Sequence, residues 1–177
     1  MTTFFQYVQT EGERVSKEKG QYVFNQGDQE DAIYFVQSGL LKAFYTSEQG
    51  KESIKSFLSA NDVIGSLTAL YLRQSSSFSL ISLAPTVLIK LSFNAILMQA
   101  KHDIIFANEL NDLLLTLALK KETREYELLC LTAEQRYAKL IESTPTLLQN
   151  VTQSDLASYL GVTPVGLSRI KKRLFTR

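Results

Sequence analysis

Residues 151–170 read VTQSDLASYLGVTPVGLSRI, and their order is typical of two short helices joined by a tight turn. Thr152, with an acidic residue three positions later, resembles the start of a helix. Gly161 lies where the chain has to turn sharply and where a positive φ angle is favoured. Thr163 is a good N-cap residue, and Pro164 is a good first residue of the second helix. The stretch therefore predicts a helix-turn-helix.

The apolar residues of this stretch determine which side of the second helix is free. Leu167 and Ile170 are three positions apart and turn one side of that helix towards the first helix. Arg169 then lies on the outer side, where a guanidinium can donate two hydrogen bonds to guanine in the major groove. Lys171, Lys172 and Arg173 suit phosphate contacts, which add affinity without reading the base sequence. We expect the DNA-binding surface to comprise Gln153, Thr163, Pro164, Val165, Ser168, Arg169, Lys171, Lys172 and Arg173.

The charge of the chain is distributed unevenly around this stretch. The formal net charge is +1, but residues 151–177 hold five Lys and Arg residues against one Asp, which gives +4. Residues 1–100 sum to −1, from 8 basic and 9 acidic residues, and residues 101–150 sum to −2, from 6 and 8. A basic end on a weakly acidic body is typical of a face for a polyanion. A solvated basic tail is the alternative interpretation of the charge alone.

The first half of the chain has the pattern of a β-domain. Between Glu13 and Leu91, short β-prone segments alternate with turns at spacings of about 8–12 residues, which favours an antiparallel barrel or jelly roll. A short helix is expected over residues 66–72. The expected strands cover residues 21–24, 33–36, 40–45, 51–58, 77–82 and 87–91.

After Leu91 the sequence changes from strand-like to helical. From Asn94 to Leu131 there is no Pro or Gly, and Leu, Ala, Lys and Glu dominate. We expect a short helix and then a long one over about 103–129, which at 1.5 Å per residue is ~40 Å long. A helix longer than its own domain needs another apolar surface, and we expect a second copy of the chain to supply it. The alternative is that the helix packs only across its own β-domain.

Two domains follow from this pattern. Residues 1–131 are expected to form a sensor-type β-domain that includes the long helix. Residues 132–177 are expected to form three short helices that end in the helix-turn-helix, with Pro145 interrupting the first of them.

Composition excludes several functional classes. The chain has one cysteine, Cys130, and one histidine, His102, which is too few for a structural zinc site or an iron–sulfur cluster. We expect both to be structural and expect no cofactor. There is no nucleophile elbow or phosphate loop, so an enzyme is not expected. No apolar stretch reaches the ~18 residues of a membrane span, and the start lacks a signal-peptide pattern, which favours the cytoplasm.

These motifs together resemble the Crp/Fnr family of regulators over nearly the whole chain. Residues 27–39 (GDQEDAIYFVQSG) look like the first barrel hairpins of that family, and residues 61–65 (NDVIG) look like the entry to its effector pocket. Residues 131–137 and 160–170 are similar to its C-terminal domain. The resemblance implies a cyclic-nucleotide-binding-type β-barrel, a long dimerisation helix and a winged helix that binds double-stranded DNA.

The effector pocket departs from the family's pattern. Family members that bind cyclic AMP have a glutamate after the pocket glycine and an arginine about ten residues later. Here Ser66 follows Gly65, and Ser76 stands at the position of the arginine, whose charged fork a hydroxyl cannot replace. Cyclic AMP is therefore not the expected effector. Another anion and an effector-free barrel with internally bonded serines both stay open. The candidate pocket residues are Gly65, Ser66, Arg73, Ser76, Ser77 and Lys121.

The DNA-binding end departs as well. Val165 replaces a glutamate that is common in the family's recognition helix, and Gly166 follows it at a cost of ~1 kcal/mol relative to Ala. Little of the printed sequence follows the helix, so we expect a reduced or absent wing. The leading hypothesis is a homodimeric, sequence-specific DNA-binding transcription regulator, with RNA polymerase and an unidentified small molecule as further candidate partners. The alternative is a sensor that acts through a protein partner and carries a vestigial helix-turn-helix.

Overall fold

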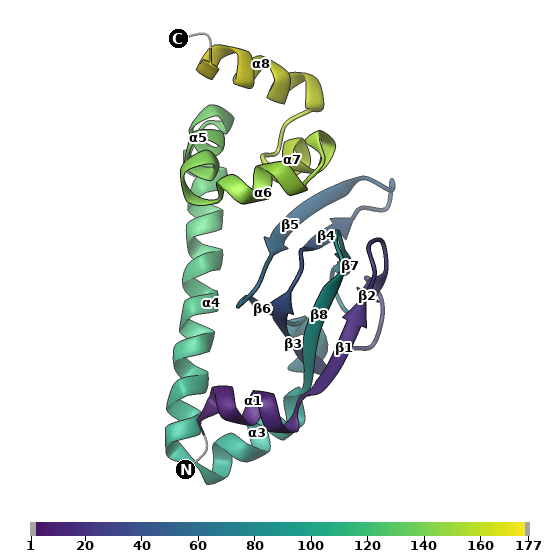
Figure 1. Cartoon of the computed structure of the whole chain (residues 1–177), viewed down its shortest axis with the longest axis vertical. Coiled ribbons are helices and arrows are strands. Elements are labelled where there is room, and N and C mark those ends of the chain that lie inside the picture. The colour runs from purple at the N-terminus through teal and green to yellow at the C-terminus, as the bar shows by residue number, and fades with distance from the viewer. Residues whose placement is uncertain (1–2, 176–177) are drawn as a thin grey trace.

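The chain folds into a β-domain, a long helix beside it, and a helical head at one end of that helix (Figure 1). The computed structural model describes residues 3–175, and the last two residues of the expected C-terminal domain lie outside them. The strands are β1 Glu13–Lys17, β2 Tyr22–Phe24, β3 Ala32–Ser38, β4 Leu41–Thr46, β5 Glu52–Leu58, β6 Val63–Ile64, β7 Ser79–Ser82 and β8 Thr86–Ser92. The helices are α1 Phe4–Glu11, α2 Leu67–Leu70, α3 Phe93–His102, α4 Ile104–Cys130, α5 Ala133–Ser143, α6 Pro145–Asn150, α7 Gln153–Tyr159 and α8 Pro164–Phe175.

The strands form two antiparallel four-stranded sheets. Their orders are β1-β8-β3-β6 and β2-β7-β4-β5, so consecutive strands alternate between the sheets, as in a jelly roll, except for the β4–β5 hairpin. The sequence pattern did not distinguish between a barrel and a jelly roll. The two separate sheets correspond to the jelly roll and not to a closed barrel.

Alternation along the strands places one apolar face of each sheet in the space between them. Leu41, Leu80 and Leu88 are fully buried there, and Phe24 packs edge-on against Phe78. Burying side chains of this size contributes roughly 1.5–3 kcal/mol each, so this core holds the two sheets together.

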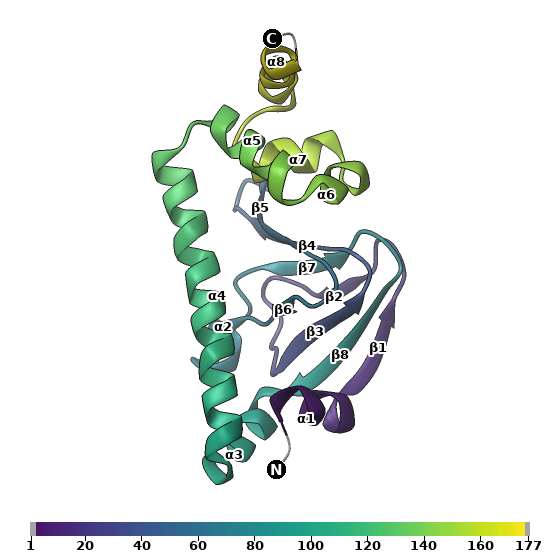
Figure 2. The same ribbon diagram turned by 60° about the vertical axis from the view of Figure 1, so that its left-hand side comes forward.

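A second core lies between the sheet of β3 and β8 and the helices α1, α3 and α4 (Figure 2). Phe106 of α4 is fully buried there, against Phe4 and Tyr7 of α1. The sequence interpretation missed α1, although Thr3 and Gln6 form a full capping box at its start. It also assigned no strand to β1, an edge strand in which three of five residues are charged.

The long helix has the expected position and length. α4 contains 27 residues, and the Asp103 side chain caps its first turn by accepting hydrogen bonds from the backbone amides of Ile105 and Phe106. Of its side chains only Phe106 and Leu110 are buried, so the remaining three-quarters of the helix faces solvent on at least one side. The hydrophobic cores of its own chain therefore leave much of α4 uncovered.

The head contains four helices where the sequence predicted three. Pro145 does interrupt the chain after α5, but it also begins α6 as its first residue. The core of the head includes Leu40, Phe57, Leu83 and Ala84 from the β-domain, so α7 lies against β5 and the adjoining loops.

Candidate nucleic-acid interface

The helix-turn-helix forms as the sequence predicted. The Thr152 hydroxyl accepts a hydrogen bond from the Asp155 amide at 3.0 Å and begins α7. Gly161 adopts φ +70°, the left-handed conformation that favours glycine. The Thr163 hydroxyl accepts from the Gly166 amide at 3.1 Å, and Pro164 is the first residue of α8.

The inner faces of both helices are closely packed. Leu156, Leu160 and Leu167 are each at most 1% exposed, and Ile170 is 5% exposed. These contacts fix the rotation of α8 about its own axis. Its remaining sides are therefore the ones that can meet another molecule.

Most of the expected DNA-binding residues lie on the exposed sides. Val165 is 63% exposed, and Ser168, Arg169 and Lys172 are exposed as well. Gln153, Thr163 and Pro164 are exposed at the starts of α7 and α8. α8 is the outermost element of the head, at the end of the molecule opposite α3 (Figure 2). A reading helix needs this placement to enter a groove.

Lys171 and Arg173 are engaged within the head. The Lys171 ammonium donates to Gln153 Oε1 and lies 5.8 Å from the centre of the Tyr137 ring. Arg173 pairs with Glu134 of α5 at 3.0 Å. These contacts tie α8 to α5 and α7, whereas the sequence assigned both side chains to phosphate contacts. Exposed ion pairs contribute at most about 1 kcal/mol, so a DNA phosphate can compete for Arg173.

An arginine that the sequence interpretation did not select connects the head to α4. Arg136 of α5 donates to the carbonyl of Leu131 and to that of Glu127 at 3.2 Å, both at the end of α4. It also donates to the Leu160 carbonyl in the turn between α7 and α8, at 2.7 Å. Carbonyls at a helix C-terminus lack partners within the helix, and a cation near them is favourable. The sequence signal that could have indicated Arg136 is its position in the first turn of α5, after the Thr132 capping box.

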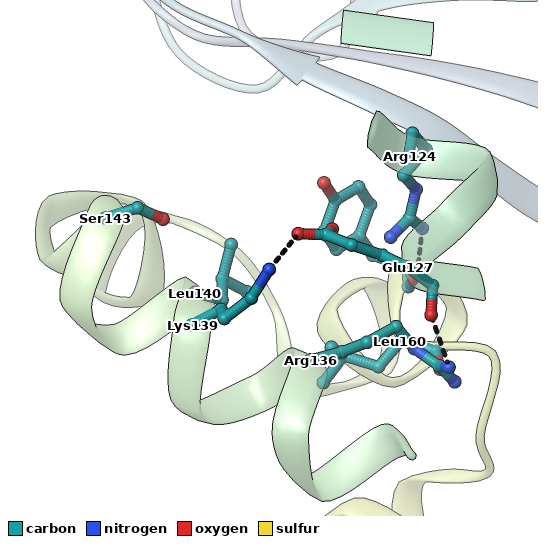
Figure 3. Close-up of a pocket in the computed structure, with 8 residues that line it drawn as sticks. Arg124, Glu127, Arg136, Lys139, Leu140, Ser143 and Leu160 are labelled. Atoms are coloured by element: carbon teal, nitrogen blue, oxygen red, sulfur yellow. Dashed lines mark hydrogen bonds and ion pairs between the residues drawn. The ribbon is translucent and has the colours of Figure 1, made fainter. Parts of the chain in front are cut away.

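A second arginine completes this junction, where a small cavity lies between α4, α5 and α7 (Figure 3). Arg124 donates to the Tyr159 carbonyl, and its guanidinium lies 3.8 Å from the centre of the Tyr159 ring. Burial lowers the pKa of Arg124, with the nearby Tyr159 and Glu127 opposing the effect. Lys139 pairs with Glu127 at 3.4 Å on the open side of the cavity. The junction is therefore built mainly from cations that bind backbone oxygens.

The serines of the candidate effector pocket bond within the protein. Ser76 is 2% exposed and donates to the Phe78 carbonyl at 2.8 Å. Ser66 is 1% exposed and lies at the N-cap of α2, as expected, but its hydroxyl bonds the Thr68 hydroxyl and not the helix backbone. A Cβ on Gly65 would lie 2.8 Å from a Leu70 methyl, which explains the absence of a side chain there.

The charged candidates form no hydrogen bond with these serines within the described part of the chain. Arg73 is exposed and donates to Asn94 Oδ1 of α3 at 2.9 Å. Ser77 is exposed, and Lys121 is exposed on α4. Arg73 is therefore engaged with α3, and the assignment of Arg73 and Lys121 to an effector pocket stays a prediction.

Comparison with known proteins identifies the β-domain. Residues 14–103, just over half of the chain, match the family model of the cyclic nucleotide-binding domain. The chain belongs to this family. Among solved structures, FixK2 from Bradyrhizobium japonicum has the same fold as this chain, with a TM-score of 0.80. The two sequences are 19% identical, and the match covers 93% of this chain and 85% of FixK2. The regulator CLP of Xanthomonas campestris gives 0.77, at 16% identity over 98% and 91%.

Two curated relatives of this family member resemble it beyond the matched domain. The regulatory protein HlyX of Actinobacillus pleuropneumoniae is 28% identical over 167 residues, which cover 88% of this chain and 69% of HlyX. The electron transport regulator A of Shewanella oneidensis is 26% identical over 167 residues and is covered to 66%. The resemblance to the Crp/Fnr family is thereby confirmed, and these relatives are regulators and not enzymes, as we expected.

Two further properties of this family member concern membrane-spanning helices and metal sites. Within residues 3–175, no helix is both long and apolar enough to cross a membrane. In the same part of the chain, no three His, Cys, Asp or Glu side chains gather into a possible metal site. His102 is exposed at the end of α3, and Cys130 is the exposed last residue of α4.

Proposed function

We propose that this protein is a homodimeric transcription regulator that binds DNA sequence-specifically through α8, in the cytoplasm. The observation that carries the proposal is the exposure of Arg169 on a helix whose opposite side is fixed by the buried Leu167 and Ile170. The net charge of +4 over residues 151–177 supports a polyanionic partner. RNA polymerase is a further partner of such a regulator bound near a promoter.

The surface of α4 supports assembly with a second copy. Leu115, Leu119, Tyr126 and Leu129 are between 55% and 77% exposed. Their spacings of 4, 7 and 3 residues follow the alternating 3-4 pattern of a coiled-coil seam, with Glu122 at the intervening position. A seam of this kind pairs with an identical seam across a two-fold axis. We therefore infer a dimer through α4, which light scattering would detect as about twice the 20.0 kDa chain mass.

Gly166 bears on the alternative, a sensor with a vestigial helix-turn-helix. A Cβ at Gly166 would lie 3.3 Å from the Thr163 hydroxyl and 3.5 Å from Val162 Cβ. The Gly166 amide also donates the bond that caps α8. The glycine therefore accommodates the tight entry into α8, and its presence does not argue for a degenerate helix. The exposed Val165 is the remaining observation that favours the alternative.

Fluorescence anisotropy on operators found by genome-wide footprinting tests the proposal. We expect inverted repeats with half-sites about 34 Å apart, one helical turn of DNA. Replacing Arg169 by Ala should weaken binding by ~1–3 kcal/mol and relax specificity at one position in each half-site. The matched control, Lys172→Ala, should weaken binding to all sequences alike and reduce the salt dependence by about one charge per subunit. Unchanged affinity and preference in Arg169→Ala would overturn the assignment of α8.

A further inference from the structure

The basic residues of α8 are divided between two sides of the helix. Successive residues of an α-helix are rotated by about 100°, so Lys171 lies roughly 200° around the axis from Arg169. Leu167 and Leu174, on the same side as Lys171, both pack into the core of the head. Exposure agrees with this placement, because Lys171 is half-buried whereas Lys172 is exposed. Lys171 therefore starts from the side of α8 opposite Arg169.

The ammonium group of Lys171 is held between α5 and α7. It donates a hydrogen bond to Gln153 Oε1, the side-chain amide oxygen of the first residue of α7. It also lies 5.8 Å from the centre of the ring of Tyr137, which is 3% exposed. The face of an aromatic ring attracts a cation at this distance. Two other helices of the head therefore hold the end of this side chain.

The contact determines which end of the Gln153 amide faces outward. An ammonium group has three donors and no acceptor, so it can bond only the oxygen of the amide. The amino group of the same amide then lies on the side away from Lys171. Its two N–H groups have no acceptor among residues 3–175, and Gln153 is exposed. The contact therefore leaves an oriented pair of donors at the surface of α7.

The first helix of a helix-turn-helix crosses the DNA backbone while the second enters the major groove. Glutamine side chains are among the groups that donate to phosphate oxygens there. We propose that Lys171 is a positioning residue for DNA binding, which holds the Gln153 amide so that its amino group donates to a DNA phosphate. Lys171 itself does not contact the DNA, in contrast to the phosphate contact that the sequence predicted. This role rests on the proposed function of α8.

A positioning lysine and a contacting lysine differ in their effect on the salt dependence of binding. A lysine that contacts a phosphate releases a counterion, which contributes about 0.9 to the slope of the logarithm of affinity against the logarithm of salt concentration. A neutral amide releases none. Removal of Lys171 should therefore weaken binding and leave this slope unchanged.

Fluorescence anisotropy on a footprinted operator, at salt concentrations between about 50 and 200 mM, tests this role. We expect Gln153→Ala and Lys171→Met each to weaken binding about 3- to 10-fold, because each removes or misorients a hydrogen bond to a phosphate in every half-site. The double variant should bind within about twofold of the weaker single variant, since both changes affect the same contact. Lys171→Arg keeps a donor for the amide oxygen and should retain most of the affinity. The matched control, Lys172→Met, should reduce the slope by about one charge per subunit.

The double variant also separates positioning from a general loss of stability. Lys171→Met removes the contact with Tyr137 as well, so binding is measured well below the melting temperature of every variant. A weakened fold would lower the affinity of Gln153→Ala as much as that of the wild type, and the two losses would add. Losses that do not add, with an unchanged slope in Lys171→Met, support the positioning role.

Three results would overturn the role of Lys171. They are a slope reduced in Lys171→Met as in Lys172→Met, additive losses in the double variant, and undiminished affinity in either single variant. Arg169→Ala, measured on the same operator, separates these failures from failure of the proposed function. If Arg169→Ala weakens binding, α8 still reads DNA and only the positioning role is lost. If Arg169→Ala binds like the wild type, the assignment of α8 itself fails.

Discussion

The contact between Lys42 of β4 and Asp155 of α7 should contribute measurably to holding the head against the β-domain. The Lys42 ammonium lies 3.0 Å from an Asp155 oxygen, and the two side chains are only 12% and 16% exposed. Exposed ion pairs contribute about 0–1 kcal/mol, whereas breaking a buried pair costs about 3–5 kcal/mol. Each partner here retains a second polar contact, Lys42 with Glu52 at 3.1 Å and Asp155 with the Thr152 hydroxyl at 2.8 Å. We therefore expect a coupling free energy of about 1–2 kcal/mol.

A double-mutant cycle measures this coupling. Lys42→Met, Asp155→Asn and the double variant are unfolded in urea at pH 7, and hydrogen exchange of the α7 amides reports whether the head leaves β5. Burial alone would lower the pKa of Lys42, but its hydrogen bonds to Asp155 and Glu52 outweigh burial and raise it above 10.5. The contribution of Lys42 is therefore fully present at pH 7 and is lost only as the pH rises above about 10.5. A coupling below about 0.3 kcal/mol, with unchanged exchange in α7, would refute the reasoning.

Three further predictions concern single positions. Gly161→Ala should destabilise the protein by about 1–2 kcal/mol in urea unfolding, because φ at this residue is +70°; Gly166→Ala, inside α8 at negative φ, is the control and should cost less. Leu119→Lys should shift the light-scattering mass from dimer towards monomer, because it places a charge in the exposed seam of α4. Lys55→Met should raise the free energy of unfolding at pH 7 by about 2 kcal/mol: folding lowers the pKa of Lys55 from 10.5 to about 8, which corresponds to ~3 kcal/mol, and partial exposure of the side chain screens part of this. That gain should shrink between pH 8 and 10.5, where the folded protein has already released the proton that the unfolded chain still binds; a gain independent of pH would contradict it.

Local signals in the sequence were sufficient for the helix-turn-helix. Each of these signals is local: the caps at Thr152 and Thr163 involve an amide three positions later, and the turn depends on Gly161 itself. Such signals do not depend on where the segment lies in the fold. The same holds for α4, whose start is set by Asp103. The fold class followed from strand spacing and from the family resemblance.

The contacts between distant segments could not be predicted in this way. Lys42 and Asp155 are 113 positions apart, and nothing in the local sequence around either residue indicates that they are in contact. Lys55 has the same limitation, because the β-bulge at which it lies appears only in the pairing of β4 with β5 and not in the local sequence. The hydrogen bond from the Arg73 guanidinium to Asn94 is a further contact between separate elements that the sequence did not indicate.

Arg136 has a consequence for how operators can vary. Because one guanidinium clamps the last carbonyls of α4 to the Leu160 carbonyl, the end of the dimer helix and the turn before α8 move as a single block. In the proposed dimer, the separation of the two reading helices is then set by the crossing angle of the α4 pair. The geometry of the α4 pair therefore determines which spacing of half-sites the dimer can bind. A relative of this protein could acquire a different half-site spacing by substitutions along its seam, with every DNA-contacting residue unchanged.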